Sequence, residues 1–295
     1  MRLAVASGKG GVGKTTVAVA MAEALATARG GATLVDLDVE EPNAHLLLAP
    51  RWQETYTEYM PVPIVDEARC TRCGICGEFC QFSAIAVLGD VIVTYEPMCH
   101  GCGGCWRLCP EGAIAQGKRE LGEVIVGEAG DIEGLRLVMG RLRVGEALAP
   151  PLIKRVMKRV EGQGPAVLDA PPGVSCPVMV VASLADGLVL VAEPTPFGLY
   201  DLGLALEAFA DTGKPMAVVV NRSGLGLEER LERMCEERGV EILLRLPFSR
   251  QVAEAYSRGE RLGQVWEWVG ERLLEVWAWF EQRLAPSVDQ APLEE

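Results

Sequence analysis

The chain has 295 residues, enough for about two domains at roughly 150 residues each, and 49% of them are hydrophobic against 23% charged. That balance is typical of a folded globular protein and excludes a disordered or fibrous chain. The formal net charge of −13 disfavours binding to nucleic acid and to anionic membranes, since both are negatively charged. No apolar run has the length of a membrane span and no leader pattern precedes the first apolar run, so we expect a cytoplasmic protein.

A glycine-rich loop follows the first expected strand, at 3–6. The loop reads Gly-Lys-Gly-Gly-Val-Gly-Lys-Thr at 8–15, which fits G-x4-G-K-[ST], and a helix is expected over 14–28. Such a P-loop surrounds a β-phosphate with backbone N–H groups, and the helix points its positive end at the same anion. Lys14 is expected to reach the phosphates and Thr15 to supply a hydroxyl to Mg²⁺; a plain strand-to-helix turn would need neither side chain. The predicted nucleotide-binding residues of this loop are Gly8, Lys9, Gly10, Gly11, Val12, Gly13, Lys14, Thr15 and Thr16.

Eight of the ten cysteines lie in two runs of identical spacing, at 70–80 and 99–109. Each run reads C-x2-C-x2-C-x3-C, the pattern of bacterial two-cluster ferredoxins, in which the fourth cysteine of a run ligates the other cluster. A pair of zinc sites is the alternative, but zinc needs only two cysteine pairs and leaves the remaining thiols without a role. The expected ligands are Cys70, Cys73, Cys76 and Cys109 for the first [4Fe–4S] cluster, and Cys80, Cys99, Cys102 and Cys105 for the second.

Lys9 gives the loop the form K-G-G-x-G-K-T, and with it the sequence resembles the MinD/Mrp class of deviant P-loop ATPases, which includes the nitrogenase iron protein. The resemblance implies that Lys9 crosses a dimer interface to the partner's nucleotide. ATP hydrolysis would then require a nucleotide-dependent homodimer or a pair with a homologous ATPase. The resemblance also implies that Asp38 orients or activates the attacking water, that Asp36 lies near the Mg²⁺ shell, and that Asp169 holds Mg²⁺ through water.

Three softer assignments follow from the same resemblance. The Gly173 N–H would meet the γ-phosphate, Asn221 would contact the adenine base, and a loop containing Pro247 would close over the base. A single aspartate after a strand is more often a carboxylate in a turn, but the family order of the three aspartates favours the catalytic interpretation. The expected catalytic residues are Lys9, Lys14, Asp38 and Asp169, and the expected Mg²⁺ ligands are Thr15, Asp36 and Asp169.

Strand-like and helical stretches alternate through the rest of the chain, as in the apolar runs at 188–192 and 217–220 and the helical stretch between them. We therefore expect an α/β fold with a mostly parallel sheet and helices on both faces, of the MinD/Mrp P-loop type, with a small inserted α+β ferredoxin-like domain. The expected parts are an ATPase domain at 1–60 and 121–262, the insert at 61–120, an amphipathic helix at 263–285 and a mobile tail at 286–295.

Two cysteines and the C-terminal helix stand outside these motifs. Cys176 lies seven residues after Asp169, the offset of a cluster ligand in the nitrogenase iron protein, but a small buried hydrophobe is the favoured interpretation. Cys235 is expected to be structural. The C-terminal helix is acidic rather than basic, so we expect it to pack on the ATPase core or on a partner and not to anchor a membrane.

Three functions are open, each with ATP, Mg²⁺ and two [4Fe–4S] clusters as cofactors. The resemblance to Mrp-like proteins favours ATP-dependent assembly or delivery of iron–sulfur or metal cofactors to an acceptor protein. An ATP-gated electron donor to a redox partner is the first alternative, because clusters with four ligands each are suited to conduct electrons. A positioning ATPase with redox-sensing clusters is the second, against which the acidic C-terminal helix argues.

Overall fold

The computed structural model describes residues 1–160, 162 and 164–285, so the predicted mobile tail lies outside the described residues. The strands are β1 (Arg2–Ala6), β2 (Ala32–Asp36), β3 (Arg51–Val65), β4 (Ile85–Leu88), β5 (Val91–Thr94), β6 (Ile114–Glu128), β7 (Leu135–Leu142), β8 (Ala166–Asp169), β9 (Gly187–Ala192), β10 (Met216–Ser223) and β11 (Glu241–Pro247). The helices are α1 (Lys14–Arg29), α2 (Ala44–Leu48), α3 (Ile75–Phe79), α4 (Gly104–Leu108), α5 (Ala149–Lys158), α6 (Cys176–Leu184), α7 (Pro196–Ala210), α8 (Glu228–Glu237), α9 (Arg250–Ser257), α10 (Leu262–Val265) and α11 (Trp268–Leu284), with a 3₁₀ turn at Glu96–Met98.

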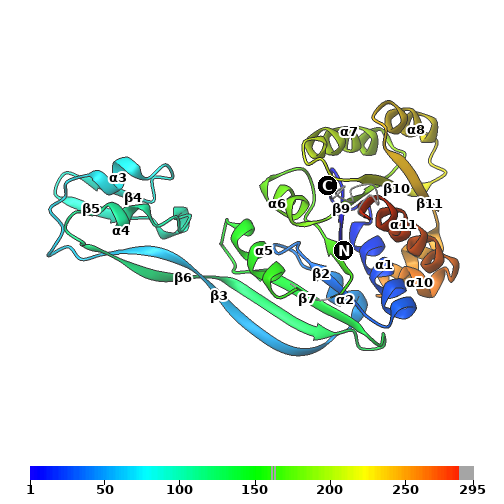
Figure 1. Ribbon diagram of the computed structural model, residues 1–295, viewed down its shortest axis with the longest axis horizontal. Helices are drawn as coiled ribbons and strands as arrows, with labels where there is room; N and C mark the ends of the chain where they lie inside the picture. Colours follow the sequence, from blue (N-terminus) through cyan, green and yellow to red (C-terminus); the bar gives the residue numbers. More distant parts are fainter. Residues whose placement is uncertain (161, 163, 286–295) are drawn as a thin grey trace, which may run out of the picture.

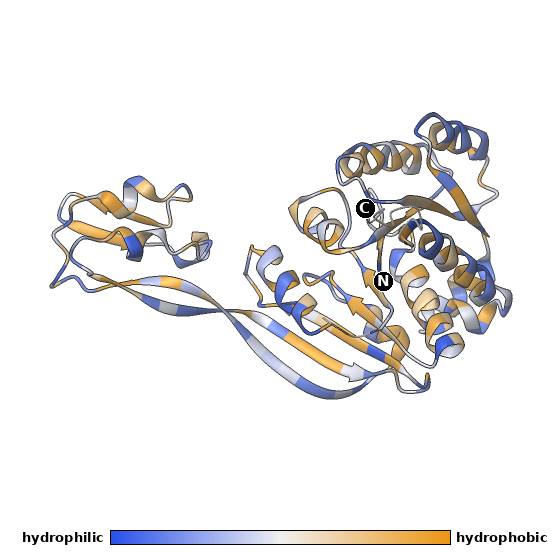
Figure 2. Cartoon of the chain, viewed as in Figure 1, coloured by the Kyte–Doolittle hydropathy of each residue, from blue (hydrophilic) through white to orange (hydrophobic). Residues whose placement is uncertain are grey.

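A single large sheet forms the body of the protein (Figure 1). Among the described residues it has nine strands in the order β11-β10-β9-β1-β8-β2-β7-β6-β3. All pairs from β11 to β7 are parallel, whereas β6 runs antiparallel to both β7 and β3. The central strands are short apolar runs buried on both faces, which is typical of parallel strands covered by helices, and Figure 2 shows their hydrophobic colour at the middle of the body.

Helices cover both faces of this sheet. Alternate residues of β1 face opposite cores: Ala4 packs with residues of α5, α6 and α7, and Leu3 packs with residues of α1 and α11. The expected α/β class, with a mostly parallel sheet and helices on both faces, is therefore confirmed. The C-terminal helix α11 lies against α1 and buries Trp277 and Phe280 completely. None of the described helices combines the length and the apolar character that crossing a membrane requires.

The edge strands β3 and β6 extend beyond the body as a two-stranded ribbon. They pair along their whole length, from Arg51 opposite Glu128 to Val65 opposite Ile114, but β7 pairs only with residues 122–128 of β6. The outer part, residues 59–65 with 114–120, is the ribbon, and it carries a head of residues 66–113 that contains α3, β4, β5 and α4 and stands away from the body (Figure 1). The strands thus run without a break through the expected domain boundaries at 60/61 and 120/121. The likeness of the head to a ferredoxin stays a prediction.

The segment at 127–158 forms the end of β6, then β7 and α5. The backbone N–H of Leu142, the last residue of β7, donates to the Val39 carbonyl (2.7 Å) in the loop that carries Asp38. Beyond Leu142, the Arg143 N–H donates to the Leu121 carbonyl on β6 (3.0 Å). The point where β7 ends and the loop at 143–148 begins is therefore attached both to the Asp38 loop and to the strand that continues into the ribbon, and the loop leads on into α5.

Candidate functional site

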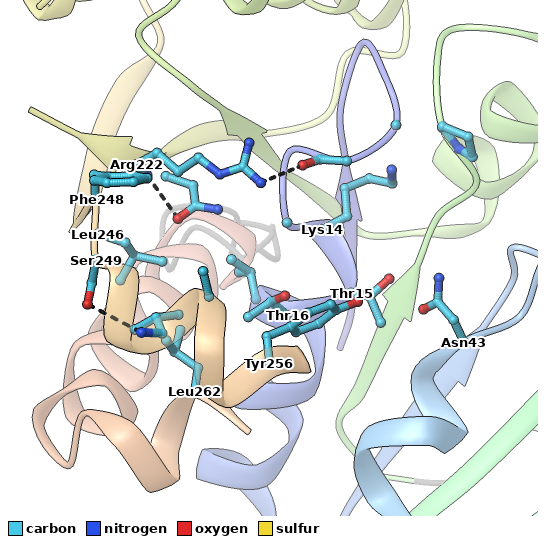
Figure 3. Close-up of a pocket in the computed structure, with 18 of the residues that line it drawn as sticks. Lys14, Thr15, Thr16, Asn43, Arg222, Leu246, Phe248, Ser249, Tyr256 and Leu262 are labelled. Atoms are coloured by element: carbon cyan, nitrogen blue, oxygen red, sulfur yellow. Dashed lines mark hydrogen bonds between the residues drawn. The ribbon is translucent and has the colours of Figure 1, made fainter. Parts of the chain in front are cut away.

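A cavity of about 410 Å³ lies at the carboxyl ends of the parallel strands, where ligands bind in open α/β sheets. The P-loop and the start of α1 form one side of the cavity. Leu246 and Phe248, around the end of β11, and Tyr256, on α9, line the opposite side (Figure 3). The predicted site residues that line the cavity are Gly10, Gly11, Gly13, Lys14, Thr15, Thr16, Asp38, Asn221 and Pro247. The other predicted residues of this site, which lie outside the lining, are Gly8, Lys9, Val12, Asp36, Asp169 and Gly173.

The conformation of the P-loop depends on glycine at position 13. Gly13 has φ +97°, in the left-handed region, and immediately precedes α1. A Cβ atom there would lie 2.4 Å from Nδ2 of Asn221, which itself donates to the Val12 carbonyl (2.8 Å). Asn221, predicted to contact a base, therefore also holds the loop in place in this structure.

Asp36 orders the loop that carries Asp38. Its fully buried carboxylate accepts hydrogen bonds from the backbone N–H groups of Asp38 (3.2 Å), Asn43 and Ala44 (both 3.0 Å). Burial, and then the charge of Asp169, raise the pKa of Asp36 well above its ordinary value. Both oxygens of Asp36 are thus engaged with backbone groups, and its predicted place near Mg²⁺ stays a prediction.

Asp169 is a buried carboxylate with both oxygens free of hydrogen-bond partners among the described residues. Burial raises its pKa to about 7, while the nearby Thr15 hydroxyl and Lys14 ammonium act in the opposite direction. Burial likewise raises the pKa of Asp38 to about 6 and lowers that of Lys14. The Asp169 carboxylate lies beside the Thr15 hydroxyl and the Asp38 carboxylate. This arrangement fits Mg²⁺, because the ion prefers oxygen ligands and keeps several of its waters.

Lys9 points away from the cavity and toward carboxylates of its own chain. Its Nζ lies 2.8 Å from Oε1 of Glu193 and 3.9 Å from Oδ2 of Asp201. Glu193 also accepts from Nη1 of Arg222 (2.8 Å), and Nη2 of Arg222 donates to the Gly11 carbonyl (3.0 Å). This network joins the P-loop to the ends of β9 and β10 and to α7. Asp201 was not predicted, because it lies inside a helix and looks in the sequence like an ordinary solvated acid.

Two other findings concern the loop between β8 and α6. The Gly173 N–H, predicted to meet a γ-phosphate, donates to the Ser7 carbonyl in this structure (3.1 Å). Cys176, expected as a small buried hydrophobe, is exposed, so that expectation is wrong. The reason is local: Cys176 opens α6 directly after an exposed loop residue, Ser175, before the helix reaches the sheet. Cys235 is buried, as expected of a structural cysteine.

The head contains two small cavities of about 20 and 30 Å³, each lined by four cysteines. Each gathers three cysteines of one run and the fourth of the other. The first cysteine cavity is lined by Cys70, Cys73, Cys76 and Cys109. The second cysteine cavity is lined by Cys80, Cys99, Cys102 and Cys105. No three His, Cys, Asp or Glu side chains in the described ranges converge as they would around one metal ion.

The surroundings of these cavities suit thiolate sulfur. Backbone N–H groups of Ala84 and Ala113 approach the sulfurs of Cys80 and Cys109 at 3.3 Å, and that of Gly101 approaches Cys99 at 3.4 Å. Such N–H···S contacts stabilise negative charge on cluster ligands. Apolar side chains, among them Ile85, Ile114 and Trp106, pack against the cysteines and limit the access of water. The donor set therefore fits an iron–sulfur group that is partly enclosed, with Cys73 and Cys102 exposed at its outer side.

Proteins of similar sequence match most of this chain. An uncharacterized protein of Methanocaldococcus jannaschii is 30% identical over 228 residues, which are 76% of this chain and 79% of that protein. An iron–sulfur cluster carrier protein of Pyrococcus abyssi is 25% identical over 275 residues, or 88% of this chain and 77% of that protein.

Solved structures of low sequence identity share the architecture. The septum site-determining protein MinD of Pyrococcus horikoshii, complexed with Mg-ADP, is 17% identical with a TM-score of 0.59 over 97% of this chain and 99% of that one. The cell division ATPase MinD of Pyrococcus furiosus is 19% identical with a TM-score of 0.57 over 96% and 99% of the two chains. A family model for the CobQ/CobB/MinD/ParA nucleotide binding domain matches residues 3–262, and the chain belongs to that family.

Proposed function

We propose that this protein is an ATP-hydrolysing iron–sulfur protein whose nucleotide site controls two [4Fe–4S] clusters held in the head. The observation that carries the proposal is the composition of the two cysteine cavities, each with three cysteines of one run and the fourth of the other. That exchange is the ligand arrangement of two-cluster ferredoxins. The clusters would supply one-electron redox chemistry, and the eight cysteines would hold them.

At the nucleotide site, the P-loop amides and Lys14 would bind the phosphates of ATP. Thr15 and the unpartnered Asp169 carboxylate would hold Mg²⁺, which neutralises phosphate charge, and Asp36 would fix the loop that places Asp38 against the attacking water. Asn221 and the loop at Pro247 and Phe248 line the end of the cavity suited to a base. The buried, partly apolar surroundings strengthen each of these electrostatic contacts.

Hydrolysis would require a dimer, either of two copies of this chain or with a homologous ATPase. Lys9 would leave Glu193 and reach the nucleotide of the partner subunit. Glu193 would keep a compensating charge after this move, since Arg222 lies 2.8 Å from its other oxygen. Binding of the γ-phosphate would favour one of two arrangements of the loops that carry Asp38 and Gly173.

Between the functions left open by the sequence, the geometry gives most support to ATP-gated electron donation to a redox partner. Each cysteine cavity offers a full set of four sulfur ligands, of which Cys73 and Cys102 are exposed, and four ligands for each cluster suit resident clusters rather than transferred ones. The hydrogen bond from Leu142 to Val39 also connects the Asp38 loop with the loop at 143–148 beside the ribbon. A movement of the Asp38 loop on nucleotide binding would therefore also move the loop at 143–148, which lies next to the head.

Assembly or delivery of iron–sulfur or metal cofactors is the second candidate. It is favoured by the similarity to iron–sulfur cluster carrier proteins of three Pyrococcus species at 23–25% identity. The exposed Cys176, at the end of the loop after β8, could meet its copy across a dimer and hold a metal or a cluster in transit. In that case the cargo would be separate from the clusters in the head.

One experiment tests the proposal and separates the two candidates. Iron and sulfide per chain are measured in anaerobically purified protein, before and after MgATP turnover with apo-ferredoxin as acceptor, with Lys14→Ala as the control that cannot bind nucleotide. Two [4Fe–4S] clusters predict about eight irons at the start. Iron that stays in the chain supports electron donation, and iron that moves to the acceptor only with hydrolysis supports delivery. A protein that holds no cluster after anaerobic reconstitution would overturn both.

A further inference from the structure

A buried ion pair lies between the second cysteine cavity and the body of the protein. Arg119 on β6 and Glu146 in the loop at 143–148 have side chains that are 4% and 1% exposed, and Nη2 of Arg119 lies 3.1 Å from Oε1 of Glu146. The same Nη2 donates to the backbone carbonyl of Cys99 (3.4 Å). Arg119 therefore joins a cysteine of the second cavity to a loop of the ATPase body.

This ion pair is a costly way to connect two elements. Nε and Nη1 of Arg119 and Oε2 of Glu146 have no hydrogen-bond partner in the described part of the chain. Burying charges with unsatisfied donors costs free energy, and apolar residues of similar volume would join the ribbon to the loop at least as well. What apolar residues would not supply is a fixed positive charge beside Cys99.

The positive charge of Arg119 acts on the second cysteine cavity. The Arg119 guanidinium donates to the Cys99 carbonyl and is almost fully buried, so little water screens its positive charge. Arg119 thus stabilises negative charge in the second cysteine cavity. The first cysteine cavity has Arg72 in its lining, but Arg72 is exposed, so water and salt screen its charge. The two cavities therefore differ in the electrostatic field at their sulfurs.

We propose that Arg119, partly compensated by Glu146, raises the reduction potential of the cluster in the second cysteine cavity above that of the cluster in the first. Reduction adds one electron, taken from a low-potential one-electron donor, and makes the cluster more negative, so a nearby cation favours the reduced form. An electron shared between the clusters then resides mainly on the one beside Arg119. The inference rests on the proposed function, since it requires both clusters to be present. Arg119 does not ligate iron, and it acts as a positioning residue through its charge.

Substitutions of the two partners of the ion pair are expected to shift the reduction potential of the second cluster in opposite directions. Glu146→Gln leaves the Arg119 charge uncompensated and raises the potential of the second cluster. Arg119→Gln removes the cation and lowers that potential, whereas Arg119→Lys keeps the charge and stays close to wild type. A role confined to packing would move the potential in the same direction in the Glu146→Gln and Arg119→Gln variants, or not at all.

The test is an anaerobic dithionite titration of the full chain without nucleotide, monitored by electron paramagnetic resonance, with iron and sulfide measured in every variant. We expect one of two midpoint potentials to move by at least tenfold in the reduction equilibrium, about 59 mV for one electron, upward in Glu146→Gln and downward in Arg119→Gln. The matched control, Arg72→Gln, should move neither potential by that amount.

The outcomes separate the inference from the proposed function. Unchanged potentials, or shifts of the same sign, in variants that retain about eight irons overturn the inference and leave the proposed function standing. If Arg119→Gln fails to fold or loses its iron, the upward shift in Glu146→Gln and the rescue by Arg119→Lys still decide the question. A wild-type chain that holds no clusters overturns the proposed function itself.

Discussion

Nζ of Lys9 lies 2.8 Å from Oε1 of Glu193, so Lys9 is held by its own chain in this structure. The family resemblance implies instead that Lys9 reaches the nucleotide of a partner subunit. The Glu193 side chain is only 8% exposed, and Arg222 approaches its other oxygen at 2.8 Å. Breaking the Lys9 contact would therefore leave Glu193 paired, which limits the cost of the movement. The ion pair is consistent with a resting arrangement from which Lys9 can be released.

Replacement of Lys9 by alanine should leave nucleotide binding intact and impair hydrolysis. Lys9 lies outside the lining of the nucleotide cavity, so the affinity for ATP, measured with a fluorescent analogue, should change by less than about threefold, while turnover should fall by about 10³-fold, the lower range for a cation supplied in trans. Lys14→Ala provides the contrast, because it should abolish binding itself. Turnover that is unchanged in Lys9→Ala would remove the role of Lys9 across the dimer.

The Glu193 network predicts a specific dependence of stability on pH. Burial pushes the pKa of Glu193 upward, but the hydrogen bonds and charges of Lys9 and Arg222 outweigh it, and the net pKa is lowered from 4.5. A lowered pKa means that the carboxylate stabilises the folded state above pH 4.5 and that this stabilisation is lost as the pH falls through the folded pKa.

The measurement is the free energy of unfolding of wild type and Glu193→Gln in urea, from pH 7 downward. The difference between the two proteins should be largest at neutral pH and should shrink below about pH 4.5. Taking the difference removes the effects of acid on the clusters, which both proteins share. A difference that is constant over this range would contradict the network.

Gly13→Ala should damage both the fold and the nucleotide site. The residue would have to adopt φ +97°, and its Cβ would lie 2.4 Å from Nδ2 of Asn221. The strain alone is worth about 1–3 kcal/mol, and relief of the clash would displace Asn221 from the loop. Gly213→Ala is the matched control, because Gly213 has φ +64° but open space around its Cβ position. Both variants should lower stability, but only Gly13→Ala should lose nucleotide binding, as measured by isothermal calorimetry.

The sequence predicted the sheet and the P-loop well, because buried parallel strands are continuous apolar runs and because the loop needs glycines at fixed positions. It did not predict β3, the strand that continues into the ribbon. Residues 51–59 are mostly polar and exposed, and such a strand is held by its backbone pairing with β6 rather than by an apolar face. The expected boundaries at 60/61 and 120/121 consequently cut through two strands.

The burial of Arg119 and Glu146 could not be predicted from the sequence, for a different reason. Arg119 lies in the charged segment Lys118-Arg119-Glu120, and nothing in these three residues marks it as the buried one. Its burial follows from the alternation of buried and exposed residues along β6, which the structure shows. Glu146 lies in a turn beside the almost fully exposed Val144. Their burial depends on contacts between elements far apart in the chain, which local patterns do not contain. The grouping of cysteines by cavity, in contrast, matches the sets that the spacing predicted, because the spacing itself encodes a known arrangement.

The C-terminal helix should contribute strongly to stability through its buried face. Trp277 and Phe280 are fully buried on α11, so Trp277→Ala should lower the free energy of unfolding by about 3–5 kcal/mol. Trp268 on the same helix is 41% exposed, and Trp268→Ala should cost less than about 1 kcal/mol. Urea unfolding of the three proteins tests this contrast. Equal effects of the two substitutions would show that α11 does not pack on α1 as described.

Cys109→Ser tests the exchange of cysteines between the two runs. Cys109 belongs to the second run but lines the first cysteine cavity, so its loss should damage the cluster whose other ligands are Cys70, Cys73 and Cys76. We expect about four of eight irons to be lost and the electron paramagnetic resonance signal of the other cluster to persist. Cys235→Ser is the control, because Cys235 is buried in the ATPase body and should leave both clusters intact. The complementary substitution, Cys80→Ser, should spare the first cluster and damage the second. If each serine instead damaged the cluster of its own run, the ligand sets proposed from the cavities would have to be exchanged.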